Sequence, residues 1–240
     1  MIAKVEKKIG VIIQRSFLKE SDAIVTALGE EGYFSFYCHG LGKSNKSKSG
    51  IVEGAYGEFV LTIKGSNYTC NEFSPLKLML PKDGLESFAL TSFILESVKK
   101  LIAEEDGPAA YPWLYGSLSA ISEGKEPFCA SLIAFAHFLE ISGIGLNVDS
   151  CSICGSKSNI IGVSFEDGGF VCSSCKPGKA SGENREILKI YRYIFKAPFS
   201  DFGRVKFSKE LALPILLELV LHAEKSLGLT WHSLDILKRL

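Results

Sequence analysis

The chain has 240 residues, 46% of them hydrophobic, so it can bury a core and is too apolar for a disordered protein. Its 27 lysines and arginines balance 27 aspartates and glutamates, which excludes a uniformly basic nucleic-acid coat; an anion-binding surface requires local clustering. The N-terminus lacks an apolar core of signal-peptide length, and the longest apolar stretch, 211–221, falls short of the about 20 residues that span a membrane. We expect a soluble, cytoplasmic protein with no membrane partner.

Residues 1–75 have the pattern of short β-strands separated by glycine turns. The predicted strands are 9–13, 23–28, 33–38, 58–63 and 68–73. A long irregular insert falls between the third and the fourth. Five strands in so short a length predict a closed β-barrel of OB type.

After Pro75 the hydrophobic period becomes helical. Three apolar faces are expected: Phe88, Leu95, Val98 and Ile102; Leu132, Phe135, Ala136 and Leu139; Leu213, Leu216, Leu217, Val220 and Leu221. Three prolines, Pro108, Pro112 and Pro127, are expected in loops. The fold class is therefore α+β, with an OB-type domain over 1–75 and an all-α domain over 76–240.

Four of the seven cysteines form two CxxC pairs, Cys151/Cys154 and Cys172/Cys175, separated by 17 residues. Two residues between thiolates allow a tight turn to aim both sulfurs at one point, and two such turns supply a tetrahedral zinc site. The segment 162–171 reads as a hairpin that joins the two turns. We expect a zinc segment over 150–178 within the helical domain.

Four cysteine ligands close the coordination sphere, so one structural Zn²⁺ is expected rather than a catalytic one. The alternative is that the two pairs bind no metal and are redox-active or vestigial. The other cysteines, Cys38, Cys70 and Cys129, lie among apolar neighbours and are expected to be buried.

The insert after the third strand carries Lys43, Lys46 and Lys48 among small polar residues, with no acid from Gly40 to Gly50. Such a loop would bring lysines to phosphates; the alternative is a solvated linker. Gly42-Lys43-Ser44 resembles the end of a Walker A loop, but Tyr37 occupies the position of the first glycine, so nucleotide hydrolysis is not expected.

The third predicted strand alternates, so Phe34, Phe36 and Cys38 would face one side and Tyr33 and Tyr37 the other. If the phenylalanines fill the barrel, the tyrosines would stack on nucleic-acid bases. Packing of the tyrosines against a neighbouring domain is an equally good interpretation.

A second basic feature follows the zinc segment. Arg185, Lys189, Arg192 and Lys196 are spaced 4, 3 and 4 apart and form one stripe of a predicted helix. The stripe would contact DNA phosphates; the alternative is an ordinary solvated helix face.

Catalytic motifs are absent from the sequence: it contains no GxSxG, HExxH or GxGxxG. His222-Ala-Glu224 resembles the HxE of zinc deaminases, but both CxxC pairs lie upstream of it instead of downstream. We expect no enzyme activity.

Several blocks together resemble the RecO family of bacterial recombination mediators over residues 5–240. They are 9–13, Glu20-Ser-Asp22, 29–32, His39-Gly-Leu-Gly-Lys43, 139–145, the two CxxC pairs with Gly168-Gly-Phe-Val171 between them, and 227–240. Their order and spacing carry the resemblance, since zinc knuckles alone occur widely.

The resemblance implies a nucleoid-associated DNA repair protein that binds single- and double-stranded DNA, anneals complementary strands and helps to load the RecA recombinase. It also implies two protein partners, RecR and the acidic C-terminal tail of single-stranded DNA-binding protein (SSB). The tail would need an apolar groove rimmed by cations such as Lys99 and Lys100.

Two other readings stay open. In one, the chain is a zinc-stabilised protein–protein adaptor without DNA affinity of its own. In the weaker one, it is a hydrolase or deaminase that uses the zinc.

Overall fold

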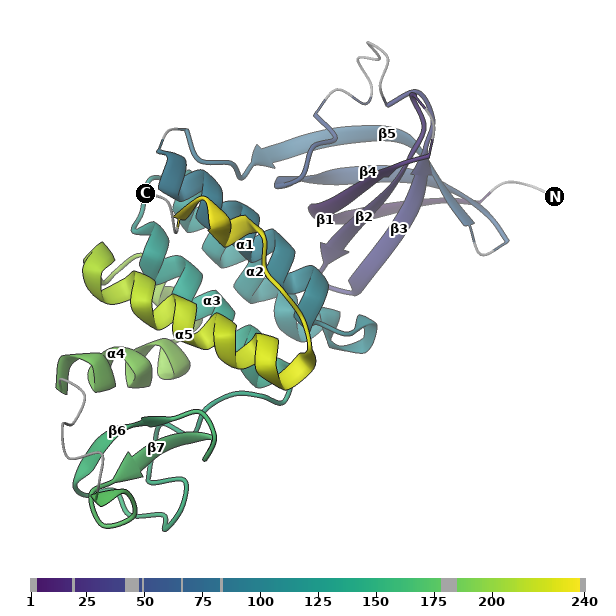
Figure 1. The fold of residues 1–240 in the computed structure, drawn as a ribbon. Coiled ribbons are helices and arrows are strands. Elements are labelled where there is room, and N and C mark those ends of the chain that lie inside the picture. Colours follow the sequence, from purple (N-terminus) through teal and green to yellow (C-terminus); the bar gives the residue numbers. More distant parts are fainter. Residues whose placement is uncertain are drawn as a thin grey trace.

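The computed structural model describes residues 4–18, 20–41, 48, 50–65, 67–82, 84–177 and 185–237. Figure 1 shows a β-barrel at one end of the molecule, a bundle of helices in the middle and a small hairpin at the other end. The strands of the barrel are β1 (Lys4–Phe17), β2 (Ala23–Gly29), β3 (Gly32–Cys38), β4 (Ala55–Lys64) and β5 (Asn67–Leu78).

The barrel is closed, as predicted, with strand order β1-β2-β3-β5-β4 and β4 pairing back to β1. The β3–β5 pair is parallel, and the other pairs are antiparallel. β1 reaches both of its neighbours because it is long and its register shifts between Ile12 and Gln14, which bends it.

Alternation along β3 fills the barrel. Phe34, Phe36 and Cys38 are buried in its core, where the Phe36 ring centroid lies 5.0 Å from that of Phe59. Cys70 lies in the same core, and Cys129 is buried in the helical part, so all three isolated cysteines are buried as expected.

The helical part contains α1 (Leu85–Leu101), α2 (Gly107–Ser122), α3 (Pro127–Ile141), α4 (Arg185–Lys196) and α5 (Lys209–Leu227). Short 3-10 helices are η1 (Glu104–Asp106), η3 (Phe199–Asp201) and η4 (Ser233–Asp235). Segment 150–178, which the sequence predicts to bind zinc, contributes the hairpin of β6 (Ile160–Ser164) and β7 (Gly169–Cys172).

The predicted apolar faces are mostly buried, and α3 is buried on nearly every side: Leu132, Phe135, Ala136 and Leu139 are all inaccessible. Two positions differ. Phe88 lies in the first turn of α1 and is 42% exposed, and Leu221 of α5 is 48% exposed. The buried face of α5 is Ala212, Ile215, Leu216, Leu219, Val220 and Ala223, a 3–4–3–4 pattern that lies next to the predicted one.

The expectation that three prolines lie in loops is wrong. Pro108 and Pro127 lie in the first turns of α2 and α3, where a missing N–H costs nothing because it would have no helical partner. Pro112 lies inside α2, so this helix tolerates the loss of one backbone hydrogen bond. Two of the three prolines thus mark helix starts. Because all three were expected in loops, α2 was not predicted.

The barrel and the helices share an apolar contact. Val11, Ile13 and Leu28 of the barrel belong to the same buried cluster as the helical core. At this junction a Cβ on Gly107 would come within 3.1 Å of the Gly32 Cα, so α2 begins close against the β2–β3 turn. Among the described residues, no helix is both long and apolar enough to cross a membrane.

Candidate metal centre and nucleic-acid interface

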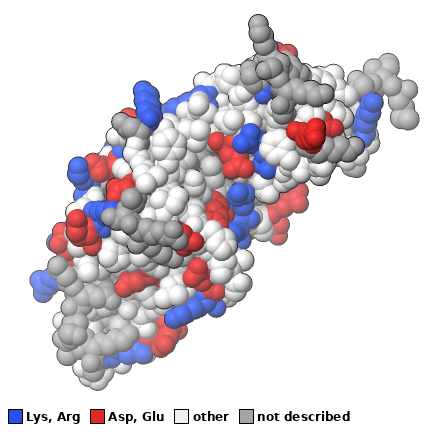
Figure 2. All heavy atoms as spheres, turned by 45° about the horizontal axis from the view of Figure 1, so that its top comes forward, with Lys and Arg blue, Asp and Glu red and all other residues white. Residues whose placement is uncertain are grey.

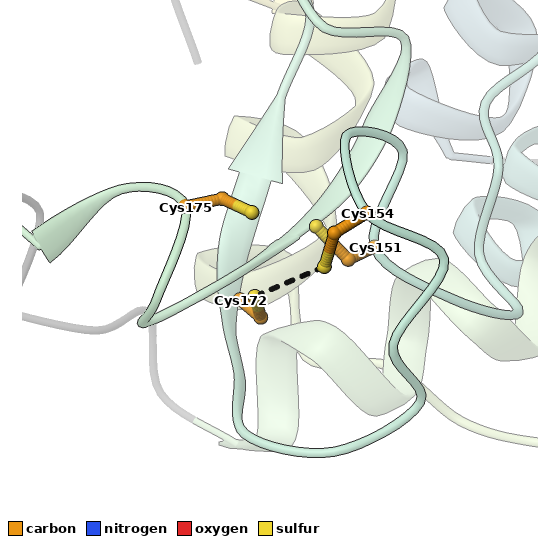
Figure 3. A group of neighbouring side chains, drawn as sticks. All are labelled: Cys151, Cys154, Cys172 and Cys175. Carbon is orange, nitrogen blue, oxygen red and sulfur yellow. Dashed lines mark hydrogen bonds between the residues drawn. The ribbon is translucent and has the colours of Figure 1, made fainter.

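The two CxxC pairs meet in space. One Sγ atom from each of Cys151, Cys154, Cys172 and Cys175 lies within 4.8 Å of every other, and Figure 3 shows the four side chains converging from the loop before β6 and from the end of β7. The Cys154 and Cys172 sulfurs are 3.7 Å apart. A tetrahedron with zinc–sulfur bonds of about 2.3 Å has sulfur–sulfur edges of about 3.8 Å. The geometry fits a four-thiolate metal site.

Each CxxC turn is closed by its own backbone. The Gly155 N–H donates to the Cys151 carbonyl at 2.8 Å, and the Cys175 N–H donates to the Cys172 carbonyl at 3.1 Å. The two turns come together because β6 and β7 pair, as the predicted hairpin requires. Local sequence therefore fixes each half of the site, and the hairpin fixes their distance.

Backbone amides and neighbouring thiols set the acidity of the cysteines. The Cys154 N–H lowers the pKa of the Cys151 thiol to about 6, and the Cys175 N–H lowers the pKa of Cys172. Cys175 differs, because its interaction with the Cys154 thiol raises its pKa to about 12. A bound cation would relieve the crowding of negative sulfurs, and with four protein ligands it would supply structural support without an open position for chemistry.

The hairpin is attached to the helices by buried and polar contacts. Val163 and Phe170 lie in the helical core. The Arg192 guanidinium in α4 donates to the Val148 carbonyl at 2.7 Å and pairs with Asp149 at 3.0 Å. A metal at the cysteines would therefore stabilise the hairpin and the helices it touches.

At the other end of the molecule, Asp22 organises the rim of the barrel where the insert begins. Its carboxylate accepts hydrogen bonds from the Tyr37 hydroxyl at 2.8 Å and from the Gly40 N–H at 3.0 Å. The His39 ring lies edge-on to Tyr37, with centroids 4.2 Å apart. The amide of Gly40 and the Tyr37 hydroxyl lower the pKa of Asp22.

Of the three predicted lysines of the insert, Lys43 and Lys46 lie outside the described residues. The Lys48 ammonium donates to the His39 carbonyl at 2.9 Å, so it lies beside the Asp22 cluster. We call Asp22, Tyr37, His39 and Lys48 the barrel rim.

The two tyrosines of β3 have different surroundings. Tyr37 belongs to the barrel rim. The Tyr33 hydroxyl donates to the carbonyls of Val98 and Ile102 in and just after α1, at 3.1 and 3.4 Å, and burial raises its pKa to about 12. The structure thus favours the packing interpretation for Tyr33.

The predicted basic stripe lies on the exposed face of α4, opposite the buried Ile190, Tyr191, Ile194 and Phe195. Half of it is engaged, because Asp149 pairs with Arg192 at 3.0 Å and with Lys196 at 2.9 Å. Among the described residues, Arg185 and Lys189 form no ion pair. Figure 1 shows α4 on the side of the helices that faces away from the barrel.

Sequence reasoning missed two groups at the same end of the barrel. Phe17, the last residue of β1, is 54% exposed, and the Arg15 guanidinium lies 5.9 Å from its ring. Asp22 appeared in the sequence only as part of a family block, and its partners come from a different strand. Phe17 lies beyond the strand predicted over 9–13, so the sequence pattern carried no signal for it.

Charges of both signs are interspersed on the molecular surface shown in Figure 2, in agreement with the neutral composition. Lys100 pairs with Glu96 at 2.7 Å and donates to the Thr230 carbonyl. Lys99 lines one hollow with Glu96 and another with Tyr33 and Ile102.

Residues 83–235 match the family model described as the C-terminal part of recombination protein O. The chain belongs to the RecO family. The matched part runs from α1 to η4 and includes the four-cysteine cluster.

Individual RecO relatives extend the similarity. The chain is 28% identical over 189 residues to the DNA repair protein RecO of Frankia casuarinae, covering 75% of this chain and 77% of that protein. It is 28% identical over 179 residues to RecO of Bacillus mycoides and 29% identical over 180 residues to RecO of Bacillus cereus (strain AH187), each covering 72% of this chain and 70% of the relative.

Proposed function

We propose that this chain is a recombination mediator in DNA repair that binds single- and double-stranded DNA, anneals complementary strands and helps to load RecA on SSB-coated single strands. Holding and screening phosphates requires cations on an adaptable surface and no nucleophile, so the proposed role is not enzymatic. The proposed location is the cytoplasm, at the nucleoid. The observation that carries the proposal is the barrel rim, in a chain that belongs to the RecO family.

The rim supports DNA binding because it combines a stacking surface with cations. Tyr37 and His39 present aromatic rings, Phe17 lies exposed at the same end of the barrel, and Lys48 lies beside them. Single-strand binders use this combination, with about 1–3 kcal/mol for each stacked base. Lys43 and Lys46, which neighbour Lys48 in the sequence, would add phosphate contacts.

The proposed domain division follows from these roles. Residues 1–75 would form the DNA-binding domain, and residues 76–240 would form the helical domain with one structural Zn²⁺ in segment 150–178. Arg185 and Lys189 would provide a second DNA surface, while Arg192 and Lys196 are engaged with Asp149. Because α4 lies on the side of the helices that faces away from the barrel, a short single strand would occupy the rim alone.

The test is an affinity series on a short single-stranded oligonucleotide at several salt concentrations. Replacing Lys43, Lys46 and Lys48 by alanine should weaken binding about tenfold and reduce the slope of log K against log salt by about 2. Tyr37→Leu should weaken binding with no change in slope, since it removes stacking and no charge.

The matched control removes cations outside the barrel. Lys157 lies in the segment of the two CxxC pairs and Lys225 in the last turn of α5; both are exposed, and neither forms an ion pair within the described part of the chain. Alanine at both should leave affinity and slope nearly unchanged. If the control variant and the triple lysine variant weaken binding equally, the rim has no special role. If the wild-type protein does not bind DNA at all, the adaptor interpretation is favoured.

An apolar groove between α4 and α5 supports the proposed SSB partner. Its volume is about 770 Å³; Ile190, Tyr193, Val205, Phe207 and Leu211 line it. Its charged lining residues are Lys189, Lys206 and Glu186, so cations outnumber acids; Lys206 also pairs with Glu126, at 3.4 Å. Apolar lining with cations at the edge suits an acidic peptide that ends in an aromatic residue.

A fluorescently labelled acidic peptide ending in Phe is the probe for this groove. Lys189→Glu should weaken its binding severalfold, whereas Lys196→Glu on the same helix, outside the groove, should not. Equal effects of the two variants would indicate non-specific attraction. RecR binding is proposed from the family alone and would be tested by co-purification with purified RecR.

A further inference from the structure

A second hollow lies at the junction of the barrel and the helices, away from the barrel rim and from the cysteines. Its volume is about 440 Å³, and its lining includes Glu30, Tyr56, Pro108, Tyr111, Tyr115 and Phe199. The lining comes from the β2–β3 turn, β4, α2 and η3, so distant parts of the sequence build it. We call it the tyrosine hollow.

Aromatic rings form most of its wall. The ring centroids of Tyr56 and Tyr115 are 5.0 Å apart at an interplanar angle of 71°, and those of Tyr111 and Tyr115 are 6.0 Å apart at 40°. Tyr111 is buried, Tyr56 and Tyr115 are half-buried, and Phe199 is 47% exposed. The wall is thus preformed and partly open to solvent.

Among the described residues that line the hollow, one is charged, and it is a carboxylate. Glu30 is exposed, and among the described residues it forms no ion pair. It lies close enough to Tyr111 to contribute, with burial and Tyr56, to a raised pKa of that phenol.

More acidic residues lie beside the hollow. A Cβ on Gly32 in the β2–β3 turn would be 3.4 Å from Pro108 and 4.0 Å from the Glu104 carbonyl, so η1 adjoins this turn. The three acids of η1, Glu104, Glu105 and Asp106, form no ion pair within the described part of the chain. Two cations, Lys7 and Lys8, line an adjoining hollow that shares Glu30 with this one, but both are paired with glutamates. The charges outside ion pairs are therefore acidic, which favours a cation over a phosphate.

We propose that the tyrosine hollow binds an arginine side chain of a protein partner. The faces of aromatic rings attract cations, and a guanidinium also stacks on them, while Glu30 would accept its hydrogen bonds. A protein partner is favoured because none of the described arginines of this chain lines the hollow. The proposal is independent of the DNA role of the barrel rim.

The experiment titrates the full-length chain with N-acetyl-arginine amide and follows the tyrosine ring resonances by NMR. The uncharged analogue N-acetyl-citrulline amide has nearly the same shape and serves as the ligand control. Arginine should shift the rings of Tyr56, Tyr111 and Tyr115 saturably and should bind at least about threefold more tightly than citrulline.

Variants locate the charge. Glu30→Gln keeps the size of the side chain and should weaken arginine binding about threefold or more, to the level of citrulline. Glu31→Gln is the matched control, because Glu31 is the next residue, pairs with Lys8 at 3.4 Å and does not line the hollow. It should bind arginine like wild type.

Equal binding of arginine and citrulline, or equal effects of the two glutamine variants, would overturn the proposal. So would single-stranded DNA that shifts the same tyrosine rings, since the hollow would then be a DNA site. A stable self-associated form that is dispersed by Glu30→Gln would support the proposal and identify the partner as a second copy of this chain.

Discussion

The hydroxyl of Tyr33 in β3 donates a hydrogen bond to the carbonyl of Val98 in α1, at 3.1 Å. This bond crosses the junction between the barrel and the helices. The Val98 carbonyl also accepts the N–H of Ile102, which ends α1. One carbonyl thus serves both the end of a helix and the attachment of the barrel.

Replacing Tyr33 by Phe should therefore lower the stability of the fold and leave DNA binding unchanged. Loss of one partly buried hydrogen bond should cost about 1 kcal/mol and lower the melting temperature by about 2–4 °C. Affinity for a single-stranded oligonucleotide should stay at the wild-type value. A loss of affinity with unchanged melting would instead assign Tyr33 to the DNA surface.

The proposed Zn²⁺ should stabilise the helical part. Cys172→Ser breaks the four-sulfur set, so zinc content should fall and the melting temperature should drop by about 10 °C, because metal-binding energy is folding energy. Chelation of wild type should have the same effect. Ser174→Ala, between two ligands and exposed, is the control. An unchanged melting temperature with Cys172→Ser would contradict the metal assignment.

Glu96 should make stability depend on acid pH. Although burial acts to raise its pKa, hydrogen bonds from Lys100 and Ser233 lower it to about 2. Because the pKa is depressed in the folded state, the ionised Glu96 stabilises the fold at pH values above the ordinary glutamate pKa of 4.5. This contribution is lost as the pH falls towards 2.

Glu96→Gln should therefore cost roughly 1–2 kcal/mol at pH 7, allowing for solvent screening, and about half as much at pH 3. The measurement is urea unfolding at both values of pH. The control is Glu105→Gln, because Glu105 is exposed and lies outside any described ion pair. It should leave the free energy of unfolding unchanged at both pH values. If Glu96→Gln lowers the free energy of unfolding equally at pH 7 and at pH 3, the pKa of Glu96 is not the cause.

Asp149 offers a test of the basic stripe on α4. Its carboxylate pairs with Arg192 and Lys196, so Asp149→Asn should release both cations. If α4 contacts DNA, the variant should bind duplex DNA severalfold more tightly and with a steeper salt dependence. Zinc content, measured in parallel, should be unchanged. Unaltered duplex affinity would leave the stripe as a solvated face.

Local patterns were enough to predict the four-cysteine cluster and most of the barrel. Cysteine spacing and a glycine turn specify two knuckles and the hairpin between them, and alternation in β3 specifies which side chains fill the barrel. These features depend on residues that are close together in the sequence.

Features built from distant segments were not predictable. Asp22 accepts a hydrogen bond from Tyr37 in β3, and the tyrosine hollow is lined by residues as far apart in the sequence as Glu30 and Phe199. Helix α2 was missed for a different reason: its prolines read as loop residues, although the first turn of a helix accepts them. Tyr33 could not be assigned because both interpretations place it on the outside of the barrel.

The two buried cores differ in how much of the chain each requires. The core of the barrel uses residues between Ile12 and Phe73, so it can be completed as soon as β5 has emerged from the ribosome. The helical core includes Trp231, whose indole N–H donates to Ser97 in α1, and Leu237. Synthesis must therefore almost finish before α1 has all of its packing partners. The barrel can complete its core earlier than the helical part can.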